Sequence, residues 1–309
     1  MKRISIALFI LVCFNVYAAH SLELELIEGV GNMAYNPDNK TALSADELNP
    51  GTFTPLYFPL IQARVSGEIN GIGFSFGFKR DPILRNSLFA NISIEQEYFT
   101  MEGGPFFGLF NSGKLPVNPG VNGNLRLMIP GIVFIEAGGS STLAAIPMEK
   151  EGNYSQITAD LKAGAWVPHV ICSLNMSMRN NTLRDTTTIL IEDELLRYFF
   201  RADVFTKNYS YTVKVDLGFQ NLKRSYSSLD IVGTDIVKTT QTDEFKSLFM
   251  GLEGIFAINP GLKLILGAEM PIYSWSVRPM KDSPKKTMFF EARAGIVIAL
   301  PAGKSQEKL

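Results

Sequence analysis

The sequence predicts an all-β fold: a transmembrane, antiparallel, up-and-down β-barrel of about 14 strands, with a range of about 12–14. Three observations predict it. Apolar and polar residues alternate with a period of two through much of the chain. Several alternating segments run for about ten residues or more, the length that a membrane-crossing strand needs. Short turns and longer connections also alternate along the chain, and this order never slips.

The alternation is clearest between residues 209 and 220. Every odd position there is apolar, from Tyr209 to Phe219, and every even position is polar or glycine. Segments 170–179 and 290–300 show the same pattern. A period of two places one set of side chains on each face of a strand, which predicts a sheet with one apolar and one polar face.

The expected strands follow from this pattern once turns are placed at Gly, Pro and Asn. In chain order they are 22–35, 55–69, 72–79, 87–100, 106–110, 121–128, 132–137, 155–167, 170–179, 189–206, 209–223, 244–258, 262–273 and 287–300. The number falls to about 12 if the short fifth to seventh segments merge. An even number returns both ends of the chain to the same side.

Short turns are expected on that side, several with the residue types of tight hairpins. They are Asn70-Gly71, Glu102-Gly103-Gly104, Pro130-Gly131, Pro168-His169, Lys207-Asn208 and Asn259-Pro260-Gly261. The longer connections are expected on the other side, at 36–54, 80–82, 111–120, 138–153, 180–188, 224–243 and 274–286.

The composition excludes other classes. The chain has 309 residues, 46% of them hydrophobic, and a formal net charge of −1. This apolar content excludes wholesale disorder, and without a basic excess we expect no nucleic-acid partner. Beyond the first twenty residues, no run approaches the ~18 apolar residues of a spanning helix. Two cysteines do not make a disulfide scaffold.

The first residues predict a secretory signal. Lys2 and Arg3 give a positive start, a long apolar run follows, and Ala18 stands where a signal peptidase reads. We expect a signal peptide over 1–18 and a mature barrel over 19–309. The alternatives are an N-terminal anchor helix and a lipoprotein signal at the first cysteine. Export with one remaining thiol favours a bacterial envelope.

On these features the chain resembles bacterial outer-membrane β-barrel proteins that are porin-like, with the spirochaetal barrels as a candidate group. The resemblance is architectural, covers nearly the whole mature chain and rests on no family-specific motif. It implies an outer-membrane location, lipid as a partner and small polar solutes as cargo. Many such barrels end on an aromatic residue that the assembly machinery reads. Here the last strand ends at Leu300, and a polar tail follows over 301–309.

Charged residues of both signs lie on the polar faces of the expected strands. Unpaired in a dry core, each would cost several kcal/mol, so a water-filled or salt-bridged lumen is expected. The candidates for lining a pore are Arg64, Glu68, Lys79, Glu95, Glu97, Arg126, Asp160, Lys162, Arg179, Arg197, Arg201, Asp203, Lys214, Asp216, Lys263, Glu269, Glu291 and Arg293. Mixed signs predict a porin or narrow channel with little charge selectivity. The alternative is a lumen closed by paired charges.

Loops 36–54 and 224–243 are candidates for binding an extracellular ligand. Residues 228–238 repeat an Asp-Ile-Val pattern around Gly233, which predicts that two strands continue above the membrane as a tall hairpin. A surface-exposed adhesin or structural barrel with a closed lumen is therefore the alternative function. A soluble periplasmic β-protein is a third.

The sequence gives little support for catalysis. His20 and His169 are its two histidines, too few for a metal cluster, and no nucleophile-elbow or phosphate-loop motif is present. We expect no enzyme, no cofactor and no metal.

Overall fold

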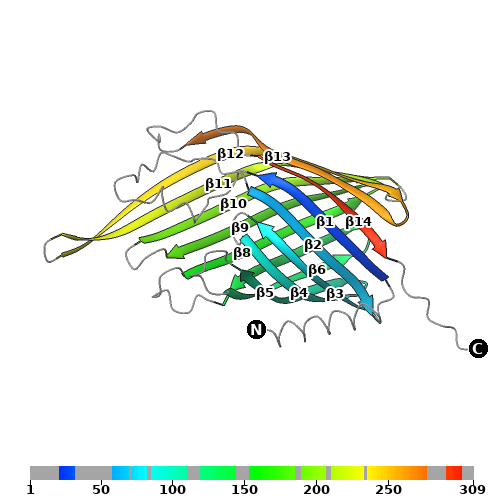
Figure 1. Ribbon diagram of the computed structural model, residues 1–309. Helices are drawn as coiled ribbons and strands as arrows, with labels where there is room; N and C mark the ends of the chain where they lie inside the picture. The colour runs from blue at the N-terminus through cyan, green and yellow to red at the C-terminus, as the bar shows by residue number, and fades with distance from the viewer. Residues whose placement is uncertain are drawn as a thin grey trace, which may run out of the picture.

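A computed structural model describes residues 21–31, 58–69, 71–81, 85–109, 118–143, 153–184, 189–206, 210–232, 235–276 and 290–300. These form a closed barrel in which each strand pairs with its chain neighbours and β1 pairs with β14 (Figure 1). The strands are β1 Ser21–Gly31, β2 Phe58–Ile69, β3 Ile72–Asp81, β4 Arg85–Glu95, β5 Phe99–Leu109, β6 Asn118–Ile129, β7 Val133–Thr142, β8 Asn153–Val167, β9 Val170–Arg184, β10 Ile189–Phe205, β11 Tyr211–Val232, β12 Asp235–Asn259, β13 Leu262–Ser276 and β14 Glu291–Leu300.

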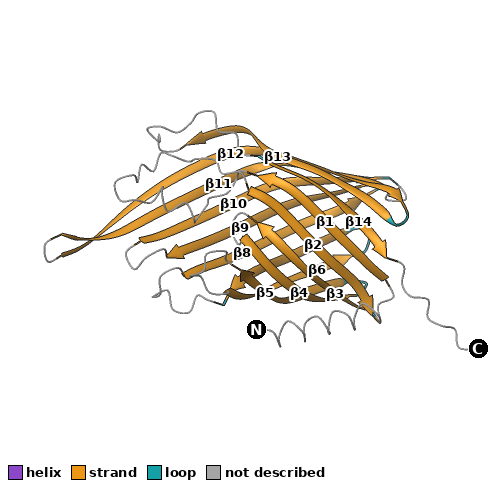
Figure 2. Cartoon of the chain, in the orientation of Figure 1, coloured by secondary structure: helices purple, strands orange, loops and turns teal. Residues whose placement is uncertain are grey.

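All pairings are antiparallel, which confirms the predicted fold class and the count of 14 over the alternative of 12. The barrel closes where Leu22 of β1 lies opposite Leu300 of β14. The described chain is strand with short turns (Figure 2), and it contains no helix long and apolar enough to cross a membrane.

The short turns lie at the end of the barrel where β1 begins and β14 ends (Figure 1). Gly71 and Gly131 have φ angles of 79° and 71°, and His169 has 66°. Tight hairpins between right-twisted strands require such left-handed residues, and glycine supplies them without strain. The predicted turns around these three residues are confirmed.

One predicted turn is wrong. The β4–β5 turn covers residues 96–98, where the Gln96 amide donates to the Phe99 carbonyl at 2.8 Å. The predicted turn residues, Glu102 to Gly104, lie inside β5 instead. A Cβ on Gly104 would clash with the backbone of Ala90 in β4. The glycine therefore permits a close approach between two strands, and it does not turn the chain.

Several strands run further than predicted into the longer connections. β7 ends at Thr142, not at residue 137, because Gly138 and Gly139 pair with residues of β6. β9 likewise ends at Arg184, where residue 179 was expected. Glycine and asparagine suggested loops in both places, but the neighbouring strands supply ladder partners for the backbone there.

The predicted tall hairpin is confirmed, and the predicted loop 224–243 is wrong. β11 and β12 stay paired to Val232 and Asp235, so most of that segment is strand. Figure 1 shows this hairpin in yellow-green and yellow, projecting beyond the other strands on the side opposite the short turns. The predicted signal 1–18, loop 36–54 and tail 301–309 lie outside the described residues.

The outward face of the barrel is apolar and exposed. Leu174, Ile92 and Leu217 expose 68%, 63% and 54% of their surface, whereas few apolar residues of the described chain are buried. A soluble sheet protein would bury such side chains against a second layer. An exposed apolar band of this kind is what a barrel presents to lipid.

Candidate functional site

The candidate site is the inner wall of the barrel. Residues directly opposite each other on paired strands share a face, so the register carries the inward face from strand to strand. The inward face includes Arg64, Glu68, Lys79, Glu95, Arg126, Asp160, Lys162, Arg179, Arg197, Arg201, Asp203, Lys214, Asp216, Lys263, Glu269, Glu291 and Arg293.

Glu97 is the exception among the predicted candidates. It lies in the β4–β5 turn and not on the inward face of a strand. The prediction failed because that turn was placed too late, which made Glu97 the neighbour of Glu95 on a single strand. That the other candidates line a conducting pore stays a prediction.

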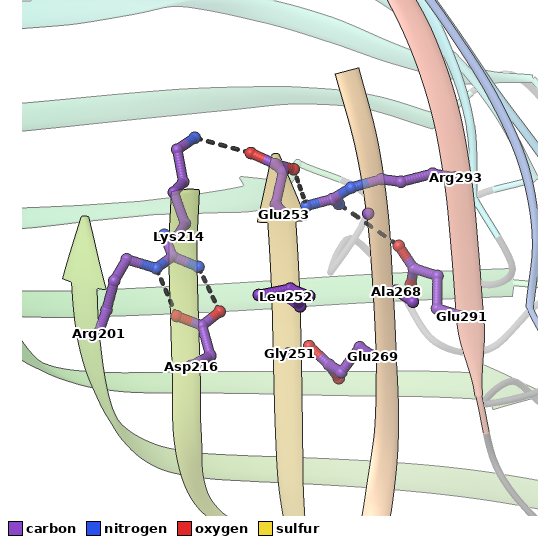
Figure 3. Close-up of a pocket in the computed structure, with 11 residues that line it drawn as sticks. Arg201, Lys214, Asp216, Gly251, Leu252, Glu253, Ala268, Glu269, Glu291 and Arg293 are labelled. Carbon is purple, nitrogen blue, oxygen red and sulfur yellow. Dashed lines mark hydrogen bonds and ion pairs between the residues drawn. The ribbon is translucent and has the colours of Figure 1, made fainter. Parts of the chain in front are cut away.

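The wall formed by β10 to β14 carries a network of ion pairs (Figure 3). Arg201 donates two hydrogen bonds of 2.6 Å to the two carboxylate oxygens of Asp216. Glu253 accepts from Lys214 at 2.8 Å and from Arg293. Arg293 also reaches Glu291 of the same strand at 3.4 Å, so positive and negative groups alternate through this network.

Arg197 forms a brace across this wall. It starts on β10 and pairs with Glu269 of β13 at 2.5 Å, although β11 and β12 lie between the two strands. Three strand spacings amount to about 14 Å along the curved wall. The two side chains therefore meet by crossing the inside of the curve, and we call this contact the Arg197–Glu269 chord. The inward positions Gly218 of β11 and Gly251 of β12 have no side chains to obstruct it.

The brace covers an aromatic residue of the wall. The Arg197 guanidinium lies 4.1 Å from the ring centroid of Phe249, and Phe249 has no exposed surface. Cation–π contact with a desolvated ring adds up to about 2 kcal/mol. The chord from Arg197 to Glu269 therefore fills part of the lumen and holds four strands together.

A second charged cluster lies on β6 to β8. Arg126 donates to Glu136 at 2.5 and 2.8 Å, and Asn124 donates to the other carboxylate oxygen at 3.0 Å. Arg126 and Lys162 both lie 5.2 Å from the ring centroid of Phe134. In the ladder Glu136 stands directly between these two cations, opposite Arg126 on one side and Lys162 on the other.

A further part of the wall, on β4 to β8, is polar but mostly uncharged. Asn91 donates to Glu102 at 3.0 Å and accepts from Asn122 at 3.0 Å. The hydroxyls of Ser140 and Thr158 lie 2.8 Å apart. Amide and hydroxyl groups both donate and accept hydrogen bonds. This stretch can therefore bind a polar molecule through the donors or through the acceptors of that molecule.

A cavity of about 300 Å³ lies against this stretch, and its lining also includes the charged residues Lys79, Asp160 and Arg179. It takes residues from every strand between β3 and β9 and is therefore a section of the lumen. Its lining is Lys79, Ser87, Phe89, Phe106, Asn122, Ser140, Gln156, Thr158, Asp160, Ser177, Met178 and Arg179. A smaller cavity of about 100 Å³ lies among the ion pairs of β10 to β14 (Figure 3).

Three acidic residues of the wall were missed by the sequence analysis. Glu102 was assigned to a turn, whereas Glu136 and Glu253 lie on strands whose alternation was already visible. Phe134 and Glu136 alternate with Val133 and Ile135, so the period of two would have found Glu136. Glu136 forms an ion pair with Arg126, and Glu253 forms one with Arg293.

No metal site appears in the described part of the chain, since no group of three His, Cys, Asp or Glu residues could hold an ion there. Cys172 is a free thiol on the apolar, outward side of β9. The described wall offers groups for hydrogen bonding and ion pairing around its two cavities.

Comparison with family models and with characterised proteins gives no match. Among solved structures, a bacterial polysaccharide outer membrane secretin is similar with a TM-score of 0.51 and 9% identity, over 91% of this chain and 99% of that chain. An outer membrane channel from Pseudomonas putida F1 has a TM-score of 0.45 and 8% identity, over 92% and 96%. OmpT of Vibrio cholerae has 0.42 and 6%, over 90% and 97%.

The chain thus has the fold of a bacterial outer-membrane β-barrel, as its resemblance implied. At such low identity the likeness establishes the fold and no activity.

Proposed function

We propose that this protein is a channel of the bacterial outer membrane for the passive diffusion of small polar solutes. The observation that carries the proposal is the inverted distribution of side chains. The outward face is apolar and exposed, whereas the inward face is polar and borders a cavity of about 300 Å³. A barrel in a membrane meets both requirements, because lipid contacts its apolar outward face and water contacts its polar inward face.

Water in the lumen also explains how the inner charges are tolerated. Asp216 is only 9% exposed, and burying such a carboxylate without a partner costs several kcal/mol. Its fork-shaped contact with Arg201 offsets that cost. Less well-paired groups such as Lys263, which is 3.9 Å from Glu23 and 46% exposed, need water.

The balance of charge supports weak selectivity between anions and cations. Positive and negative groups of the wall alternate, so their fields largely cancel along the lumen. A pore of this kind sorts solutes by size and hydrogen bonding more than by net charge. The Arg197–Glu269 chord narrows the path on one side.

Conductance of the refolded protein in planar bilayers tests the proposal. We expect steady single-channel steps and a reversal potential near zero in a salt gradient. The control is the same preparation after boiling, which unfolds the barrel. Folded, heat-modifiable protein that never conducts would overturn the proposal.

A surface-binding barrel is the second candidate, and the β11–β12 hairpin favours it. The two strands stay paired as far as Val232 and Asp235, well past Ser276 at the end of β13. Removing 224–243 separates the two functions. Unchanged steps with loss of adhesion to host-type surfaces would favour binding, and larger steps would make the hairpin a constriction of the pore.

A further inference from the structure

We propose that the cavity between β3 and β9 is a binding section for uncharged, polyhydroxylated solutes of the size of a small sugar. The inference rests on the proposed channel function and names the class of solute for it. Its basis is a set of hydrogen-bonding groups around one open section of the lumen, together with two inward phenylalanines.

The first observation concerns an acid and a base that do not pair. Asp160 of β8 lies opposite Ser177, and Arg179 of β9 lies opposite Thr158, so Asp160 and Arg179 are diagonal neighbours on one face. Neither forms an ion pair with another described residue. Both head groups border the cavity and can accept or donate hydrogen bonds there.

On the wall formed by β10 to β14, the charged groups are already paired. In the smaller cavity, every acid and base of the lining is engaged in an ion pair, Glu269 with Arg197 and the others among themselves. A solute that bound them would first have to break ion pairs. The hydrogen-bonding capacity available to a solute therefore concentrates on the β3–β9 side.

The second observation is that two phenylalanines form an apolar part of the cavity lining. Phe89 and Phe106 lie opposite each other on β4 and β5, both inward. Their rings pack over Gly77 and Gly120 of the outer neighbouring strands, where any side chain would clash with them. Phe106 is only 5% exposed, whereas Phe89 keeps part of its ring accessible. The rings thus lean against the wall and leave the lumen open.

The chemistry of these groups matches a sugar. A sugar ring carries hydroxyls that donate and accept around its edge, and its faces present C–H groups that pack on aromatic rings. Asp160 accepts from two hydroxyls, Arg179 donates, and the hydroxyls and amides of the wall do either. One acid, Asp160, stands against two bases, Lys79 and Arg179, so the lining keeps a formal charge of +1 and disfavours cations. The hydroxyl and amide side chains of the lining outnumber these charges, which favours a solute rich in hydroxyls.

Binding and block experiments test the proposal. Maltotriose is the neutral probe, and glucuronate and lysine are charged probes. We expect maltotriose to interrupt the ion current and to give saturation-transfer NMR signals with detergent-solubilised barrel. Asp160→Asn and Arg179→Gln should each weaken maltotriose binding about tenfold, the effect of losing one charge-assisted hydrogen bond. Lys263→Gln, an inward cation outside this cavity, is the matched control and should change binding less than twofold.

The outcomes separate this proposal from the channel function. A barrel that conducts but neither binds nor is blocked by maltotriose overturns the solute class and leaves the channel standing. A barrel that does not conduct but still binds maltotriose through Asp160 and Arg179 supports the cavity and overturns the channel. Tighter binding of glucuronate or lysine than of maltotriose, or equal loss of binding in the Lys263→Gln control, also overturns the proposal.

Discussion

At the scale of single residues, the inner wall places carboxylates beside guanidinium groups where water is scarce. Asp216 shows the effect most clearly, because both its oxygens accept from Arg201 at 2.6 Å and little of it is exposed. Lys263 and Glu23 form the opposite case, a long contact between two half-exposed groups. The two pairs should therefore differ strongly in what they contribute to stability.

We expect Arg201→Gln to lower the free energy of unfolding by about 1–3 kcal/mol, because Asp216 is left buried without its partner. Lys263→Gln should change it by less than about 1 kcal/mol, as is usual for exposed pairs. Urea unfolding from lipid vesicles, followed by tryptophan fluorescence, measures both. Equal effects would contradict the assignment of a buried pair.

Backbone conformation gives a second prediction at this scale. His169 has a φ of 66° in the β8–β9 turn, where a Cβ costs roughly 1–2 kcal/mol. We expect His169→Gly to raise the free energy of unfolding by up to about 1 kcal/mol, despite the greater freedom of glycine in the unfolded chain. Gly131→Ala, with a φ of 71° in another turn, is the matched opposite and should destabilise. A destabilised His169→Gly variant would contradict the strain argument.

At the scale of elements, glycines decide how side chains and strands fit together. Gly104 lets β4 and β5 approach, and Gly218 leaves room for Phe199 of the neighbouring strand. Local sequence reasoning interpreted Gly103-Gly104 as part of a tight turn and Gly138-Gly139 as the start of a long connection. Only the partner strand reveals whether a glycine turns the chain or accommodates a neighbour.

The chord gives the prediction for this scale. Arg197→Ala removes a side chain that crosses two strands, so we expect a larger single-channel conductance and renewed exposure of Phe249. Glu269→Gln should enlarge the conductance less, because its side chain keeps its volume. Planar-bilayer recording measures both, with Lys263→Gln as the control for loss of an inward cation. A conductance unchanged in Arg197→Ala would show that the chord does not restrict the path.

At the scale of the whole molecule, the barrel is polar inside and apolar outside. This distribution sets opposite tolerances for charge on the two faces of each strand. Leu217 is outward and 54% exposed, whereas Ser177 is inward and borders the larger cavity.

We expect Leu217→Lys to destabilise the folded barrel by about 2–4 kcal/mol in lipid, the cost of a lysine on the lipid face near the midplane. Ser177→Lys adds the same charge to the water-facing side and should cost less than about 1 kcal/mol. The folded fraction on cold gel electrophoresis after refolding into vesicles compares them. Equal tolerance of both substitutions would contradict the assignment of faces.

The sequence by itself determined the fold class, a count of 12–14 strands and the tall hairpin, and the strand pairing decided for 14. The reason is that the period of two and the order of short and long connections are local properties of the chain. The sequence also assigned every candidate except Glu97 to the inward face of the barrel. It could do so because alternation fixes the face of a residue once its strand is known.

Only the tertiary structure decided which of these residues meet. Arg197 and Glu269 are 72 positions apart and belong to strands that are not neighbours. Their contact depends on the curvature of the closed wall, which brings side chains of non-neighbouring strands within reach of each other. The sequence likewise does not reveal that Asp160 and Arg179 are diagonal neighbours that form no ion pair. Register between strands brings these two groups to one section of the lumen, and register is a property of the assembled barrel.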